Sequence, residues 1–183
     1  MSAMRVAVIG PEKTGKSAWL MRQITGNFAP GHAQAEPVRY SLNYWTNLGQ
    51  KTLHFVELPS GSPSEGLGQY DACIWFYDGR SPVPAEVRAH PNAVLVWSLL
   101  DAEPSRSASQ IADGSYDLPS EQGTKSRAFR ALQLLSSVNR YCPYYDISAK
   151  TLYNQEKPIL AILRARYGKE LHFTLAHVQA AKL

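Results

Sequence analysis

The sequence predicts an α/β domain with a mostly parallel six-stranded sheet and helices on both faces. Apolar runs of strand length alternate with segments of helical periodicity, a pattern that favours a parallel sheet covered by helices. A glycine-rich stretch joins the first strand to the first helix. Two neighbouring runs near residue 48 are separated by a turn, which predicts one antiparallel hairpin. The length of 183 residues suits a single domain spanning 1–183.

Each expected element follows from its local pattern. Short apolar or alternating runs predict the strands, and spaced apolar residues predict the helices. The expected strands are 5–9, 38–45, 51–57, 72–77, 93–98 and 144–147. The expected helices are 16–24, 85–90, 125–139 and 155–167. The strand at 144–147 and the helix at 155–167 are expected to be the last, and strand 38–45 to lie at an edge of the sheet.

Two connections contain the residues of flexible loops. Residues 59–68 hold three glycines and two prolines, which predicts an irregular loop. Residues 102–124 are rich in serine, glycine, aspartate and proline, so this stretch is predicted to be a flexible insertion.

Composition excludes several classes of function. The net charge is +4, but both signs are mixed along the chain and no block of like charges marks a nucleic-acid-binding arm. No run of 18 apolar residues and no lipid-accepting cysteine near the end is found, so we expect no membrane anchor. Cys73 and Cys142 are expected to be reduced core thiols, and the five histidines lack metal-ligand spacing.

The clearest motif is GPEKTGKS, which follows the first strand and opens the first helix. It matches the phosphate-binding loop G-x-x-x-x-G-K-[ST] at every required position. Gly10 and Gly15 permit close approach of the backbone, whose N–H groups then face an anion. Lys16 is predicted to contact the phosphates, and Ser17 to ligate Mg²⁺. The predicted binding residues of the loop are Gly10, Pro11, Glu12, Lys13, Thr14, Gly15, Lys16, Ser17 and Ala18.

A second stretch indicates the family. The run YYDISAKTLYNQEKPILAILRARYGKELHF, residues 144–173, resembles the Ran branch of the small GTPases. Weaker likenesses occur at 24–28 and at 70–82, so the resemblance extends over about 5–173. It implies the P-loop small-GTPase fold, with GTP or GDP as ligand and Mg²⁺ as cofactor.

The resemblance also assigns the base-binding residues. Ser148, Ala149 and Lys150 match the SAK guanine loop, in which the alanine N–H meets the guanine O6. The usual Asn-Lys-x-Asp motif is reduced here to Ser98-Leu99-Leu100-Asp101, where the aspartate alone remains. Asp101 is therefore expected to accept hydrogen bonds from guanine, unless it merely caps the end of a strand. Ser98 is expected to weaken a brace between loops that asparagine normally supplies.

Other positions depart from the family in ways that weaken hydrolysis. Glu57 takes the place of the aspartate on the Mg²⁺ side, so we expect it to join Ser17 at the metal. Ser60 stands at the position of the γ-phosphate-sensing glycine, unless Gly61 serves instead. The catalytic glutamine is replaced by Gly61 or Ser62, so no catalytic residue is assigned and any GTPase activity is expected to be slow.

Three functions remain open at this point. The first is a monomeric Ran-like guanine-nucleotide-binding protein of the nucleus and cytoplasm, whose partners would be nuclear transport receptors or an exchange factor. The second is a pseudo-GTPase scaffold or decoy that binds nucleotide weakly or not at all. The third is another P-loop enzyme, such as an ATPase or nucleotide kinase, against which the SAK run argues. Aromatic residues on the hairpin, Tyr40, Tyr44 and Trp45, form a candidate partner surface unless they pack in the core.

Overall fold

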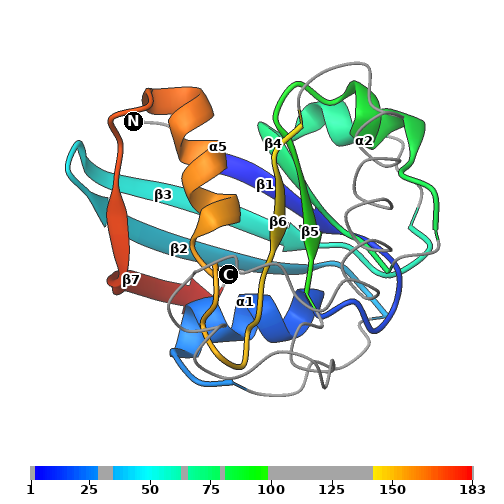
Figure 1. Cartoon of the computed structure of the whole chain (residues 1–183), viewed down its shortest axis with the longest axis horizontal. Coiled ribbons are helices and arrows are strands. Elements are labelled where there is room, and N and C mark those ends of the chain that lie inside the picture. Colours follow the sequence, from blue (N-terminus) through cyan, green and yellow to red (C-terminus); the bar gives the residue numbers. More distant parts are fainter. Residues whose placement is uncertain (1–2, 29–34, 63–65, 79–80, 99–141, 183) are drawn as a thin grey trace, which may run out of the picture.

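The computed structural model describes residues 3–28, 35–62, 66–78, 81–98 and 142–182 (Figure 1). Two predicted features, the insertion at 102–124 and the helix at 125–139, lie outside these residues, and so does Asp101. No helix in the described ranges is both long and apolar enough to cross a membrane.

One sheet organises the molecule, with strand order β6-β5-β4-β1-β3-β2-β7. Neighbours from β6 to β3 run parallel, whereas β2 is antiparallel to both β3 and β7. The mostly parallel six-stranded sheet of the prediction is thus confirmed for β1 to β6. These strands are Met4–Ile9 (β1), Val38–Thr46 (β2), Gly49–Glu57 (β3), Ala72–Phe76 (β4), Ala93–Trp97 (β5) and Tyr144–Asp146 (β6).

The seventh strand, β7 (Phe173–Lys182), corrects the prediction that the chain's last element is a helix. It pairs antiparallel with β2, from Tyr40 opposite Lys182 to Thr46 opposite Phe173, with an irregularity near Thr46 (Figure 1). β2 is therefore an interior strand and not the edge strand that was expected. The pairing is between segments more than 120 residues apart, so no local sequence pattern could reveal it.

The described helices are short. α1 (Lys16–Thr25) follows β1, α2 (Ala85–Ala89) precedes β5, and α5 (Lys157–Tyr167) follows β6; one 3₁₀ turn, η1 (Leu67–Gln69), precedes β4. α5 begins two residues later than predicted, because residues 155–156 belong to a turn, in which the Gln155 amide donates to the carbonyl of Leu152 at 3.3 Å.

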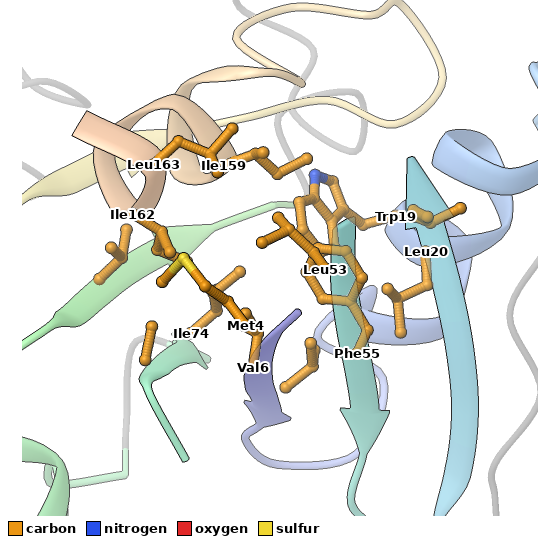
Figure 2. Close-up of a cluster of buried hydrophobic side chains, with 14 of the residues drawn as sticks. Met4, Val6, Trp19, Leu20, Leu53, Phe55, Ile74, Ile159, Ile162 and Leu163 are labelled. Atoms are coloured by element: carbon orange, nitrogen blue, oxygen red, sulfur yellow. The ribbon is translucent and has the colours of Figure 1, made fainter. Parts of the chain in front are cut away.

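Alternate residues of β1 enter two hydrophobic clusters, as the period of a strand requires. Val6 and Val8 join the larger cluster, which contains Trp19 and Leu20 of α1 and Ile159 of α5 (Figure 2). Ala7 and Ile9 join the other cluster, which contains Val87 of α2 and both buried thiols. The prediction of reduced core cysteines is confirmed. α1 thereby becomes fixed against the sheet and against α5.

The aromatic surface predicted on the hairpin is wrong for two of its three residues. Tyr44 is completely buried and Tyr40 nearly so, both in the larger cluster. The ring of Tyr44 also lies 5.0 Å from that of Phe173 on β7. Only Trp45 points outward, with 46% of its surface exposed. Because β7 covers the edge of β2, the tyrosines pack in the core.

Candidate functional site

The glycine-rich loop, residues 10–17, lies where the strand order changes direction. β1 pairs with β3 on one side and β4 on the other, both parallel, so the loop leaves the carboxyl edge of the sheet between two strands. In open α/β sheets ligands bind at such a point. The chain then enters α1 directly at Lys16, so the N-terminus of the helix faces the same space. We call residues 10–17 the phosphate loop.

Glycine is required at two positions of the phosphate loop. Gly10 has a φ of 143°, and a Cβ built there would lie 2.3 Å from the carbonyl oxygen of Phe76. Gly15 has a φ of 87°, and a Cβ there would lie 2.3 Å from the hydroxyl of Ser98. The motif's glycines thus allow the loop to contact the ends of β4 and β5 without a side chain between them.

The middle of the loop closes on itself. The hydroxyl of Thr14 is buried and donates to the carbonyl of Pro11 at 2.8 Å. Lys13 has a left-handed φ of 59°, an unusual conformation for a residue with a side chain. Lys13 and Glu12 are both exposed, so their side chains do not hold the loop together.

Lys16 is held in the centre of this loop. Its ammonium donates to the carbonyls of Gly10 at 2.7 Å and Pro11 at 2.8 Å, and to the hydroxyl of Ser60 at 3.2 Å. Burial lowers the pKa of Lys16, while the carboxylates of Glu57 and Glu12 act in the opposite direction. An ammonium has three donors, so a phosphate oxygen that binds Lys16 has to compete with one of these acceptors. Ser60, a hydroxyl on a loop, is the most readily replaced.

Glu57 and Ser17 form the expected metal-side pair. Glu57 ends β3 beside β1, and its Oε1 accepts a hydrogen bond from the Ser17 hydroxyl at 2.5 Å. The side chain is 1% exposed, and within the described ranges its Oε2 is buried without a hydrogen-bond partner. A buried oxygen without a donor is costly. A hard divalent cation would satisfy it, so the two residues fit Mg²⁺.

Few protein ligands surround this pair. Among the described residues no group of three or more histidine, cysteine, aspartate or glutamate side chains could hold a metal ion. Mg²⁺ is typically bound by one or two carboxylates together with substrate phosphates and water. The donor set therefore suits an ion that arrives with a phosphate ligand better than an ion held by the protein alone.

Glu57 provides a prediction for pH dependence. Burial raises the pKa of Glu57 from its ordinary value of 4.5, although the Ser17 hydroxyl and the Lys16 charge lower it. Between 4.5 and the raised pKa, the folded state binds more protons than the unfolded state, so stability decreases as the pH rises. We expect Glu57→Gln to remove this decrease when nucleotide and metal are absent.

Urea unfolding at several values from pH 4.5 to pH 7.5 tests this. The control is Glu36→Gln, which removes an exposed carboxylate. The stability difference between Glu57→Gln and wild type should increase with pH, in favour of the variant, and that of Glu36→Gln should stay nearly constant. If the difference in stability between Glu57→Gln and wild type does not change with pH, the raised pKa of Glu57 is contradicted. Lys16 contributes with the opposite sign, because its lowered pKa makes the stability rise with pH between that pKa and 10.5.

Ser98 itself connects two loops. Serine in place of asparagine was expected to weaken the brace between loops, but its buried hydroxyl donates directly to the carbonyl of Thr14 in the phosphate loop. The short side chain suffices because Gly15 lets the two segments approach closely.

The Ser148–Lys150 segment reaches the same edge of the sheet. The Ile147 amide donates to the carbonyl of Trp97 at 2.9 Å, so the segment begins beside the end of β5, next to Ser98. Ser148 and Ala149 are buried, and Lys150 is exposed. The structure thus brings the two sequence motifs to one edge, with Ser98 contacting the phosphate loop between them. The sequence reasoning did not assign Gln155 to the site. It named Ser60 and Ser98 but did not predict their contacts with the phosphate loop, because these contacts join distant segments.

Gly61 and Ser62, where the resemblance to Ran places the catalytic glutamine, form a turn. Gly61 has a φ of 77°, and the Ser62 amide donates to the carbonyl of Pro59 at 3.1 Å. Neither residue carries a side-chain amide that could orient water.

Comparison with known proteins supports the fold. No protein-family model matches the sequence. Among solved structures, the chain is similar to the crystal structure of bacterial selenocysteine-specific elongation factor EF-Sec, with a TM-score of 0.61 and 12% sequence identity. The similarity covers 90% of this chain and 28% of that chain. At this identity the likeness shows the shared α/β fold alone, and it does not single out the Ran branch.

Proposed function

We propose that this chain binds GDP and GTP together with Mg²⁺ and hydrolyses GTP slowly. The observation that carries the proposal is the phosphate loop, in which Lys16 lies buried behind two carbonyls and Ser17 contacts the buried carboxylate of Glu57. We further infer the small-GTPase form of the fold, with helices on both faces of the sheet. The distribution of α1, α5 and α2 between two clusters supports this inference.

Each group has a role in binding. The loop amides and the N-terminus of α1 attract the phosphates, and the Lys16 ammonium neutralises their charge. Ser17 and Glu57 would hold Mg²⁺, which, when bound, offsets phosphate charge. We propose that Ala149 and Asp101 recognise guanine. Loss of a buried polar partner costs about 1–3 kcal/mol, so the two together would favour guanine over adenine.

Hydrolysis is proposed to be slow because positions 60–62 offer no group that orients water. A small GTPase that has its glutamine reaches an intrinsic rate of only about 10⁻⁴ s⁻¹. We expect the single-turnover rate of this chain to be lower still, measured as release of γ-phosphate from bound GTP. A rate equal to or above that value would contradict the expectation.

The resemblance to Ran adds finer proposals. We propose a monomer of the nucleus and cytoplasm whose partners are nuclear transport receptors or an exchange factor. Trp45 at the outward side of the hairpin is the residue of the predicted aromatic surface that remains available for such a partner. Pull-down of purified transport receptors with the GTP-loaded and GDP-loaded chain tests this.

One observation favours a second candidate, a pseudo-GTPase scaffold. The three donors of Lys16 already have acceptors within the protein, and the Glu12 carboxylate lies close enough to affect the pKa of Lys16. Both features oppose phosphate binding. Extraction and identification of the nucleotide that co-purifies with the chain distinguishes the candidates, because GDP or GTP supports the first and an empty protein that binds no added GTP supports the second.

A further inference from the structure

The segment that follows β6 has an irregular but well-defined backbone. We call residues 147–155 the base loop. Its Ser148 amide donates to the carbonyl of Tyr153 at 2.9 Å, and its Thr151 amide to the hydroxyl of Ser148 at 3.2 Å. The Asn154 side chain donates to the carbonyl of Asp146 at 3.0 Å. The loop therefore curls back onto the strand from which it leaves.

This curl includes strained residues. Leu152 and Asn154 both have left-handed φ angles, which leucine seldom adopts and asparagine adopts more readily. Such conformations persist where surrounding contacts fix them. Bonds within the loop close it on β6, but they do not fix its distance from the phosphate loop.

Contacts with α1 fix the distance of the base loop from the phosphate loop. The indole N–H of Trp19 donates to the carbonyl of Gln155 at 3.1 Å, and the side-chain amide of Gln155 donates to the carbonyl of Trp19 at 3.1 Å. Gln23, one turn further along α1, donates to the same Gln155 carbonyl at 3.2 Å. Trp19 and Gln155 have no exposed surface, so water does not compete for these bonds.

The helix end of this link is rigid. Trp19 packs edge-on against Phe55, with 5.9 Å between ring centroids, and at a tilt against Phe76, with 5.7 Å between centroids. Figure 2 shows its indole reaching from α1 toward α5, with Leu53 and Phe55 beside it. Trp19 lies two residues after Ser17, so a displacement of Gln155 relative to Trp19 is also a displacement relative to the phosphate loop.

We propose that Trp19 and Gln155 are positioning residues that hold the base loop at a fixed distance from the phosphate loop. The proposal rests on the proposed function, since it concerns how that site recognises a nucleoside. The base and the phosphates of a nucleotide are separated by a limited distance. If the base loop is already held at the matching distance from the phosphate loop, the protein binds the nucleotide more tightly, because the loop does not have to be ordered on binding. Affinity for the phosphate portion alone does not depend on this register.

The test compares three ligands with Gln155→Leu. Leucine keeps most of the volume, removes the donor to Trp19, and also removes an Oε1 that lacks a partner among the described residues, so the loss of stability is small. We expect the Kd for GDP to rise about tenfold. The Kd for ADP divided by the Kd for GDP, which measures the preference for guanine, should fall about tenfold. The Kd for pyrophosphate should change less than about twofold. Gln50→Leu, on the exposed hairpin, is the control and should leave all three unchanged.

A second readout does not require nucleotide. Amide hydrogen exchange at Ser148 and Thr151 should be faster in Gln155→Leu than in wild type, whereas exchange in β1 stays the same. If Gln155→Leu fails to fold, Gln23→Leu removes only one of two donors to the Gln155 carbonyl, and a rise of about threefold in the GDP Kd is then expected.

The outcomes separate the two proposals. If wild type prefers GDP over ADP and Gln155→Leu retains this preference, the positioning role is contradicted and the proposed function is not. An equal loss for GDP, ADP and pyrophosphate also contradicts it, because that result indicates general destabilisation. Wild type without any preference for guanine overturns the proposed function, and the positioning role with it.

Discussion

Replacing Lys16 with methionine is expected to weaken GDP binding at least about 100-fold, equivalent to about 2.7 kcal/mol. The ammonium is the one cation held inside the phosphate loop, among the residues whose structure is described, and it lies in a site of low exposure where charges interact strongly. Methionine keeps most of the length of the side chain but has no donor for a phosphate oxygen or for the carbonyls of Gly10 and Pro11.

The matched control for this variant is Lys13→Met. It removes the same formal charge from the same loop, three residues away, but Lys13 is exposed and its interactions are screened by solvent. We expect less than about a threefold change in the GDP Kd for this control. Fluorescence titration with labelled GDP measures both variants. Equal losses in the two would mean that net charge, and not the position of Lys16, determines binding.

Replacing Gly10 with alanine is expected to lower the free energy of unfolding by roughly 3 kcal/mol, near the upper end of single-residue effects. The new Cβ would lie 2.3 Å from the backbone carbonyl oxygen of Phe76. Phe76 is fully buried and pairs with Val96 of β5, so that carbonyl cannot move away without disturbing two strands. The φ of 143° adds a strain that alanine tolerates poorly.

Gly61→Ala separates the two contributions. Gly61 also has a positive φ, 77°, but a Cβ built there meets no atom within 4 Å. Gly61→Ala should therefore lower the free energy of unfolding by about 1 kcal/mol, through backbone strain alone. Urea unfolding of both variants gives the difference. If Gly10→Ala were no less stable than Gly61→Ala, the close contact between the phosphate loop and β4 would be wrong.

The sequence predicted the elements whose structure depends on residues close together in the chain. The strands of the parallel sheet are buried on both faces, so their sequences are continuous apolar runs, and Gly10 and Gly15 mark the phosphate loop because geometry excludes a side chain at both. Pairing between distant segments left no such pattern. β7 was missed for this reason, and with it the burial of Tyr40 and Tyr44.

The candidate site shows the same division. Lys16 and Ser17 could be assigned from the motif, because one spacing specifies the chemistry. The hydroxyls of Ser60 and Ser98 could not, because each acts on a loop more than 40 residues away. The sequence predicted that serine at position 98 would connect the loops less well than asparagine. In the structure Ser98 lies close enough to the phosphate loop for the shorter side chain to reach it.

Isothermal titration of the wild-type chain with GDP, and then with ADP, in the presence of Mg²⁺ tests the central claim most directly. If the phosphate loop binds a diphosphate while the base loop and Asp101 bind guanine, GDP releases or absorbs heat with a single site per chain and binds more tightly than ADP. No binding heat with GDP at any temperature tested, or equal affinity for the two nucleotides, would contradict the account.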